Sequence, residues 1–354
     1  MNRSQPLDGP VYFHPRTKQL IRWIPEGSFA LLEHKDIDET AALALIEKRV
    51  RGVLNYKPSM TGEYASKGTI RLVEHDIPVY DIVQPERIKG RIRQGQRIRL
   101  DKGGLWLVER EKPYFASPLF EYTHQIIRLK WNMAQLNFNE RFQSFVQNTV
   151  EYIQRDLPEI LKPLAIPPLS VDWVDKPVVV VTRGSGYLED LAAIKPYIHH
   201  FQPILFGVDG GADALLDQGL KPHVIIGDMD SISYSALHCG AELVVHAYSD
   251  GRAPGLAVAQ QYGLKAYVFR CIGTSEDAAY LLAYHGGAKQ IISVGSHAHM
   301  LDFLEKGRKG MASTILVRLR LGNKLIDVKG VHHLFPPRRD WKRHVGCEHY
   351  HSRL

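Results

Sequence analysis

Two short acidic and glycine-rich stretches contain residue types that could bind phosphate and metal. Asp209-Gly210-Gly211 follows one apolar run, and Asp228-Met229-Asp230 follows the next. Carboxylates two residues apart can point the same way, and their oxygens suit Mg²⁺ that is bound jointly with a diphosphate. The pattern predicts a nucleotide or diphosphate site at which Asp209, Asp228 and Asp230 are the metal ligands and catalytic groups. Asp230 as a helix cap is the alternative.

Glycines and one arginine could bind the phosphates of such a ligand. Gly210 and Gly211 would let the backbone approach closely, and the helix expected after them would offer its N-terminal amides. An earlier apolar run ends in Arg183-Gly184, which could face phosphate oxygens. The glycine spacing fits neither the dinucleotide fingerprint nor the P-loop, which argues against NAD enzymes and Walker-type NTPases.

Further candidates for the same nucleotide site follow later apolar runs. We assign to it Thr274, Ser275, Glu276, Asp277, His297 and Arg308. Three alternatives stay open. Glu276 and Asp277 could be first-turn acids that stabilise a helix, His297 could be an ordinary loop histidine, and Arg308 could belong to a helix cap.

The elements that must position these residues form a repeating pattern from Lys176 onward. Short apolar runs alternate with helical segments, as in a parallel sheet with crossover helices. In such a sheet, ligands bind beyond the carboxyl ends of the strands, where the candidates above are found. The expected strands are 178–181, 204–208, 224–226, 243–245, 266–269 and 291–294, and the expected helices include 189–198, 212–218 and 276–285.

The N-terminal half has a different, mixed α/β pattern. Asp38 can cap a helix over 38–48, and the alternation of basic and apolar residues around 97–107 predicts antiparallel strands. Residues 116–170 are predicted to form a helical connector packed on both halves, with self-association through its apolar stripe as the alternative. Other extended runs are 29–32, 52–55 and 78–82.

Composition limits the class of protein. The 354 residues are 44% hydrophobic and 23% charged, which is ordinary for a globular protein. The sequence shows neither an apolar run of about 20 residues nor a signal peptide, which predicts a cytoplasmic protein. The net charge of +7 comes partly from two local clusters, so no nucleic-acid partner is expected. Three cysteines suggest neither a disulfide framework nor a zinc ribbon.

Two motifs carry a resemblance to a known enzyme family. Val208–Ala212 followed by Ile225–Ser231 resembles the paired signature of the thiamin pyrophosphokinase catalytic domain. The resemblance implies ATP as ligand and Mg²⁺ held by Asp209, Asp228 and Asp230. The chain departs from the family at 270–277, where alignment on Thr274 leaves three carboxylates missing.

A second resemblance runs over nearly the whole chain. The chain is similar to the SteA-type cytokinetic ring proteins of Gram-positive bacteria. The motifs that carry this similarity are at 53–64, 207–216, 225–233, 239–257, 273–279 and 306–331. This resemblance implies a role in cell division or cell separation, recruitment to the septum, and a small SteB-like membrane protein as partner.

The N-terminal domain carries a third, separate resemblance. Residues 53–83 with 92–108 resemble the swivelling domain of phosphoenolpyruvate-utilising enzymes, without a phosphocarrier histidine near Tyr64. We therefore expect a swivel-like domain at 1–115, the connector at 116–170, a thiamin-pyrophosphokinase-like domain at 171–331 and a basic, disordered tail at 332–354. That tail holds His344, Cys347, His349 and His351.

Two functional hypotheses follow from the sequence. In the first, a cell-division protein binds a nucleotide or diphosphate with Mg²⁺, and the depleted cluster at Thr274 favours this version. In the second, an active diphosphokinase moves the terminal diphosphate of ATP onto an alcohol, with Arg183 or Arg308 stabilising charge.

Overall fold

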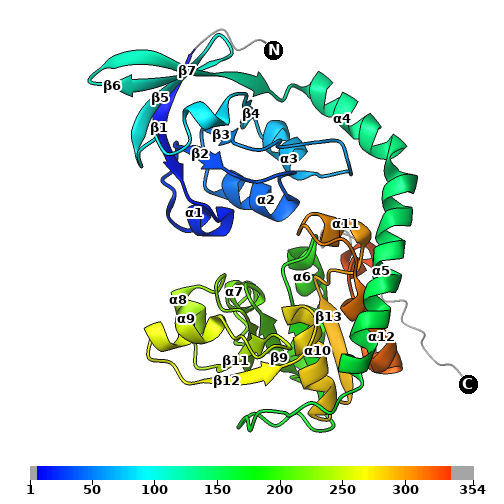
Figure 1. The fold of residues 1–354 in the computed structure, drawn as a ribbon. Helices are drawn as coiled ribbons and strands as arrows, with labels where there is room; N and C mark the ends of the chain where they lie inside the picture. Colours follow the sequence, from blue (N-terminus) through cyan, green and yellow to red (C-terminus); the bar gives the residue numbers. More distant parts are fainter. Residues whose placement is uncertain (1–5, 336–354) are drawn as a thin grey trace, which may run out of the picture. The chain divides into compact units, whose positions relative to one another are not determined.

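The computed structural model describes residues 6–335 and divides into two compact units (Figure 1). The first runs to Arg155 and also contains Ala298–Ala312. The second contains Asp156–His297 and begins again at Ser313. The assignment of Ala298–Ala312 to the first unit was not predicted from the sequence.

The first unit contains a closed barrel of seven strands in the order β1-β2-β3-β4-β7-β6-β5. Strands β1 to β4 pair in parallel, and β5, β6 and β7 join them by antiparallel pairing. The mixed α/β class is as predicted, but closure into a barrel was not. The strands are β1 (Leu7–Phe13), β2 (Phe29–Leu32), β3 (Gly52–Asn55), β4 (Val79–Ile82), β5 (Gln96–Asp101), β6 (Gly104–Glu109) and β7 (Lys112–Glu121).

Helices pack on this barrel and extend from it. The side chain of Asp38 accepts a hydrogen bond from Ala41 N at 2.7 Å, so the predicted cap of α2 is confirmed. Strand β7 continues past residue 115, and the barrel therefore reaches Glu121. The helices are α1 (Thr17–Trp23), α2 (Glu39–Glu47), α3 (Gly68–Glu74), η1 (Pro85–Arg87), α4 (His124–Leu136) and α5 (Phe138–Ile160). Helix α5 runs from the first unit into the second.

A half-buried carboxylate in the barrel gives the first testable expectation. Asp81 accepts hydrogen bonds from Ser59 N at 3.0 Å, Ser59 Oγ at 2.6 Å and Tyr122 OH at 2.7 Å. Burial raises its pKa above the ordinary value of 3.8, because desolvation outweighs these bonds.

A raised carboxyl pKa means that the folded state binds a proton more tightly than the unfolded state. The contribution of Asp81 to the free energy of unfolding is therefore full below the pKa that this carboxyl group has in the unfolded chain. It is lost as the pH rises through the pKa that the group has in the folded protein. Asp81→Asn keeps the shape but does not titrate. Urea unfolding from pH 4 to 7 should show that the wild type loses stability relative to this variant. If the unfolding free energies of the two proteins changed with pH in parallel, the raised pKa would not belong to Asp81.

The second unit is built on an open parallel sheet of seven strands, in the order β12-β11-β10-β9-β8-β13-β14. All six predicted strands are present, and β14 was missed. The chain runs outward from β8 to β12 and then returns to the other side of β8, which makes a topological switch point there. The strands are β8 (Pro177–Val181), β9 (Ile204–Val208), β10 (Val224–Gly227), β11 (Glu242–Ala247), β12 (Ala266–Arg270), β13 (Gln290–Val294) and β14 (Leu325–Asp327).

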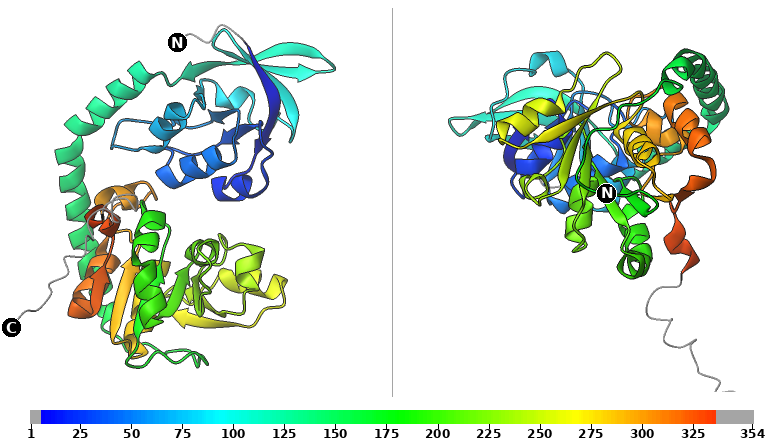
Figure 2. Two further views of the ribbon diagram at one scale, coloured as in Figure 1. Left: turned by 180° about the vertical axis from the view of Figure 1, so that it is seen from behind. Right: turned by 90° about the horizontal axis from the view of Figure 1, so that it is seen from below.

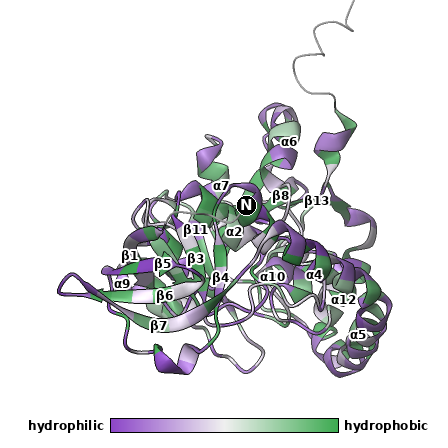
Figure 3. Ribbon diagram, turned by 90° about the horizontal axis from the view of Figure 1, so that it is seen from above, coloured by the Kyte–Doolittle hydropathy of each residue, from purple (hydrophilic) through white to green (hydrophobic). Residues whose placement is uncertain are grey.

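Helices cover both faces of this sheet. Helices α6 and α7 bury Leu191 and Leu215 against Val179 and Val181, whereas α10 packs on β8, β9, β10 and β13. Figure 3 shows α6 and α10 on opposite sides of the sheet, and Figure 2 gives two further views. The helices of the second unit are α6 (Tyr187–Phe201), α7 (Gly211–Asp217), α8 (Tyr234–Leu237), α9 (Gly255–Gln261), α10 (Ser275–His285), α12 (Ala312–Leu321), η2 (Gly322–Lys324) and η3 (Val331–Leu334). The short helix α11 (Met300–Leu304) belongs to the first unit.

The second unit extends beyond its predicted end at residue 331. The buried carboxylate of Asp190 in α6 accepts hydrogen bonds from Gly330 N at 2.8 Å and from His332 N and Nδ1 at 3.2 and 2.7 Å. The predicted tail therefore begins too early at 332. His344, Cys347, His349 and His351 lie outside the described residues. No helix within 6–335 has the length and apolar character that crossing a membrane requires.

Replacing Asp190 should release η3 from α6. Asp190→Ala leaves three donors without this acceptor, and hydrogen bonds to a charged group contribute about 1.5–3 kcal/mol each. Gly330 and His332 are half-buried, so water can replace part of this bonding in the variant. We therefore expect a loss of roughly 3 kcal/mol in unfolding free energy, which is below the sum of the three bonds, with faster amide exchange at 328–335. Asp217→Ala, at the exposed end of α7, is the control. Unchanged exchange at 328–335 in Asp190→Ala would show that these bonds do not hold η3.

Candidate functional site

Three adjacent strands of the second unit end in the main predicted residues. Arg183 follows β8, Asp209 directly follows β9, and Asp228 directly follows β10. Strand β9 lies between β8 and β10, so these three residues share one stretch of the carboxyl edge. The structure thus brings together residues that are up to 45 positions apart in the sequence.

Asp209 is held in an unusual backbone conformation. Its φ is 48°, in the left-handed region, and its Oδ1 accepts a hydrogen bond from Asp228 N at 2.9 Å. Gly227, with φ 153°, lies beneath this carboxylate, and a Cβ there would overlap Asp209 Oδ1. Only glycine at position 227 therefore lets the carboxylate of Asp209 reach over the end of β10.

Asp228 and Asp230 form a short turn after β10. Asp228 Oδ1 accepts a hydrogen bond from Asp230 N at 3.2 Å, and the intervening Met229 is buried with φ 62°. Both carboxylates are half-buried. The alternative that Asp230 caps the next helix is wrong for α8, because Ser233 is its cap and accepts from Ala236 N at 3.1 Å.

The donor set of this edge determines which metal it could hold. Among residues 6–335, no group of three or more His, Cys, Asp or Glu side chains is arranged to hold a metal ion. Mg²⁺ does not require such a group, because it usually keeps several waters and binds one or two carboxylates plus substrate phosphates. Carboxylate oxygens are the donor type that suits Mg²⁺, so one or two of the carboxylates at this edge would fit Mg²⁺ that is bound together with a phosphate ligand.

Arg183 brings positive charge to the same edge. Its guanidinium lies 2.9 Å from where a Cβ of Gly210 would be, so it passes over the start of α7. Its Nη2 is 3.7 Å from Asp213 Oδ2, and 37% of the side chain is exposed. This partly exposed guanidinium could meet an anion from solvent.

The predicted glycines have a packing role in this structure. A Cβ on Gly211 would overlap the carbonyl oxygen of Val181, and one on Gly184 would overlap that of Gly295. Glycine at these positions lets α7 and two loops lie directly against neighbouring backbone. Phosphate binding by Gly184, Gly210 and Gly211 stays a prediction.

Thr274 and Asp277 form a capping box at the start of α10. Thr274 Oγ1 accepts from Asp277 N at 3.0 Å, and Asp277 Oδ2 accepts from Thr274 N at 2.9 Å. Ser313 and Thr314 donate to the same fully buried carboxylate, and burial raises its pKa. As placed, Asp277 is a buried helix cap, which agrees with the first-turn alternative.

Glu276 is turned inward and positions His297. Its Oε1 accepts from Tyr280 OH at 2.7 Å, and its Oε2 lies 3.0 Å from His297 Nδ1. Burial acts to raise the pKa of Glu276, but the hydrogen bonds and charge of His297, with Tyr280, outweigh it and leave the pKa lowered. Glu276 therefore cannot be a direct phosphate ligand as placed, whereas His297 keeps a partly exposed ring.

An ion pair beside Glu276 was not predicted from the sequence. Arg318 Nη2 lies 2.7 Å from Asp327 Oδ2 and 3.9 Å from Glu276 Oε1. Asp327 also accepts from Ser296 Oγ at 2.7 Å. These residues lie on α12, on the missed strand β14 and after β13, and no motif connects them.

The remaining two predicted site residues are Ser275 and Arg308, and neither directly follows β8, β9 or β10. Ser275 is the half-buried first residue of α10. Arg308 is exposed and lies in Ala298–Ala312, which belongs to the first unit. The role of Arg308 at the sheet edge stays a prediction.

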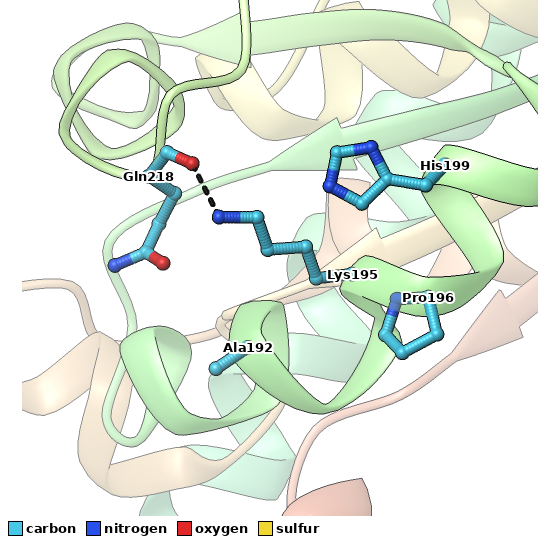
Figure 4. A pocket seen from close by; sticks show the side chains of 5 residues that line it. All are labelled: Ala192, Lys195, Pro196, His199 and Gln218. Carbon is cyan, nitrogen blue, oxygen red and sulfur yellow. Dashed lines mark hydrogen bonds between the residues drawn. The ribbon is translucent and has the colours of Figure 1, made fainter.

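A shallow pocket of about 290 Å³ lies elsewhere on the second unit (Figure 4). Ala192, Lys195, Pro196, His199 and Gln218 line it, and Lys195 Nζ donates to the carbonyl oxygen of Gln218 at 2.6 Å. Gln218 ends α7, whereas the acidic edge is at the start of that helix. None of the predicted site residues lines this pocket.

Fold and site together define an α/β protein whose open parallel sheet has an acidic and glycine-rich carboxyl edge. Two solved structures are similar to parts of it. Thiamine pyrophosphokinase from Bacillus subtilis is 20% identical with a TM-score of 0.27, over 43% of this chain and 60% of that enzyme. The leuD 3-isopropylmalate dehydratase of Methanocaldococcus jannaschii is 8% identical with a TM-score of 0.25, over 41% of this chain and 98% of that one.

These similarities are weak. The chain spans 60% of the length of the thiamine pyrophosphokinase that it matches, and at these TM-scores neither structure adds to the argument below. No protein-family model and no curated protein match the chain.

Proposed function

We propose that the second unit binds a nucleotide or another diphosphate together with Mg²⁺ at the acidic edge. The observation that carries this proposal is the meeting of Arg183, Asp209 and Asp228 at the ends of three adjacent strands. Ligands of open parallel sheets bind at this edge, beside a topological switch point. The strand order reverses between β8 and β13, and Arg183 follows β8, while Asp209 and Asp228 follow the next two strands of the sheet.

Each residue has a distinct proposed role. The carboxylates of Asp228 and Asp230 hold the cation together with waters and the phosphates of the ligand. Asp209, whose Oδ1 accepts from Asp228 N at 2.9 Å, positions Asp228 at the end of β10. Arg183 contacts the phosphates, since its guanidinium is partly exposed and lies against the start of α7. The cation supplies the neutralisation that lets an anionic ligand approach three carboxylates.

Binding without turnover is the version that we favour. Glu276 and Asp277 are the carboxylates that follow Thr274 in the sequence, and both are buried and already accept hydrogen bonds. They do not replace the carboxylates that thiamin pyrophosphokinase has at this point. An active diphosphotransferase would release AMP from ATP, and the acceptor alcohol would also have to bind.

Thermal unfolding of the full chain tests the binding proposal. ATP, ADP, GTP, diphosphate and thiamin diphosphate are compared with Mg²⁺ and with EDTA. A ligand at 100 times its Kd stabilises the folded state by about 2.7 kcal/mol and raises Tm. We expect such a rise for at least one ligand with Mg²⁺ only. No rise with any of them would contradict the proposal, and AMP release would favour the diphosphotransferase.

The resemblance to SteA-type proteins extends the proposal to the cell. We propose that the chain acts in cell division or cell separation and is recruited to the septum by a small SteB-like membrane protein. Ligand occupancy would then regulate that recruitment. A fluorescent fusion should concentrate at the septum of dividing cells, and an even distribution would count against this role.

A further inference from the structure

Tyr248 brings an exposed aromatic ring to the edge of the sheet that holds the acidic residues. It directly follows β11, as Asp228 directly follows β10. Strands β10 and β11 pair in parallel, and neighbouring strands are about 4.8 Å apart. The residue is 45% exposed. An aromatic surface that is open to solvent therefore lies one strand away from the proposed cation site.

The segment between β11 and α9 packs directly against the turn after β10. A Cβ on Gly255, the first residue of α9, would lie 2.8 Å from the carbonyl oxygen of Asp228. Ala253 and Leu256 pack against the core cluster that contains Met229, the buried residue of that turn. The two loops thus form one packed surface at the carboxyl edge.

A short hydrogen-bonded turn holds the ring of Tyr248 in place. Tyr248 N donates to the carbonyl oxygen of Arg252 at 2.9 Å, and Gly251 N donates to that of Tyr248 at 2.8 Å. The guanidinium of Arg252 lies over the ring, 5.3 Å from its centroid, and Asp250 Oδ2 accepts from Arg252 Nε at 2.7 Å. A cation over an aromatic face is attracted to it. The ring therefore has a defined position before any ligand binds, which lowers the entropic cost of binding.

Another group of aromatic residues in the second unit lies away from this edge. The ring centroid of Tyr234 is 3.9 Å from that of His238 and 5.6 Å from that of Tyr262. Tyr262 follows α9 just before β12 begins, so it lies toward the amino edge of the sheet. These rings pack on one another, whereas Tyr248 is beside the acidic turn.

The chemistry of an exposed, fixed aromatic ring suits a nucleobase. Every base has a π-face that stacks on an aromatic side chain without specific hydrogen-bond partners, and inorganic diphosphate has no such face. The carboxyl edge carries Arg183, Asp209, Asp228 and Tyr248 in that order after β8, β9, β10 and β11. A phosphate contact, the acidic residues and a stacking ring thus follow one another along the edge.

We propose that Tyr248 stacks on the base of a nucleotide whose phosphates and Mg²⁺ lie at the acidic edge. The inference rests on the proposed function and narrows its ligand from any diphosphate to nucleoside diphosphates and triphosphates. It also gives the ligand a direction, with the base toward β11 and the phosphates toward Arg183 after β8.

Calorimetric titration of the full chain in Mg²⁺ tests this role, with ADP, GDP, UDP and inorganic diphosphate as ligands. We expect at least one nucleotide to bind more tightly than diphosphate. Tyr248→Ala should weaken that nucleotide about tenfold, as expected for the loss of one stacked base, and should leave diphosphate unchanged. Tyr248→Phe keeps the ring and should bind as the wild type does. Tyr262→Ala removes a tyrosine of similar exposure, 40%, and is the matched control.

The possible outcomes separate this inference from the proposed function. If diphosphate binds as tightly as every nucleotide, or if Tyr248→Ala binds the nucleotides like the wild type, the stacking role is overturned and the phosphate site stands. If none of the four ligands binds, both are overturned.

Photo-cross-linking locates the base directly. Irradiation of the full chain with 8-azido-ADP and Mg²⁺ should label residues 246–253, and excess ADP should suppress the labelling. Labelling that ADP suppresses but that lies only outside this segment would overturn the stacking role of Tyr248.

Discussion

Gly211→Ala is expected to destabilise the second unit by about 3 kcal/mol, near the upper end of the cost of overpacking. The new Cβ would overlap the carbonyl oxygen of Val181, which is backbone and cannot rotate away. Helix α7 must then move off β8, and hydrogen bonds between the central strands weaken. Hydrogen exchange at the amides of β8 would measure the loss directly.

Gly219→Ala is the matched control for this prediction. It follows the same helix, has φ +71°, and has no atom within 4 Å of the position of a Cβ. Its cost should be only the backbone strain of about 1–2 kcal/mol. Equal losses for Gly211→Ala and Gly219→Ala would show that the close approach of α7 to β8 contributes little.

Asp228→Asn is expected to lower the affinity for the Mg²⁺-bound ligand on the order of 100-fold, about 2.7 kcal/mol. Asparagine keeps an oxygen where Asp228 Oδ1 accepts from Asp230 N at 3.2 Å, so the turn after β10 should persist. It removes the negative charge that attracts the cation. The measurement is a fluorescence titration with a labelled nucleotide, with and without Mg²⁺.

Asp217→Asn removes the same charge at the exposed far end of α7 and should leave the affinity unchanged. Asp228→Asn should also lose most of its response to Mg²⁺. If Asp228→Asn and Asp217→Asn bind the nucleotide equally well, the cation is not held at the end of β10.

The sequence was most informative where one physical rule decides the structure. The central strands β8 to β10 are continuous apolar runs because both of their faces are buried, and all were predicted. Strand β14 was missed because Leu325–Asp327 is three residues long and mostly exposed. Closure of the barrel was also missed, because pairing between β1 and β5 depends on contacts far apart in the sequence.

In the candidate site, too, some features follow from one physical rule, and others depend on contacts between residues far apart in the sequence. The acidic residues after β9 and β10 could be placed at one edge, because parallel strands all end on the same side. The inward direction of Glu276 and Asp277 could not be predicted, since it depends on Tyr280, Ser313 and Thr314 as partners. No local pattern distinguishes a buried capping carboxylate from one that faces a ligand.

Calorimetric titration of ATP and of diphosphate into the full chain tests the central claim most directly. With Mg²⁺ present, our account predicts saturable one-site binding of at least one of the two ligands to the wild type. It also predicts that this binding disappears in EDTA and weakens strongly in Asp228→Asn. Binding that is the same in wild type and Asp228→Asn, or no binding of either ligand, would contradict the assignment of the acidic edge as a phosphate and Mg²⁺ site.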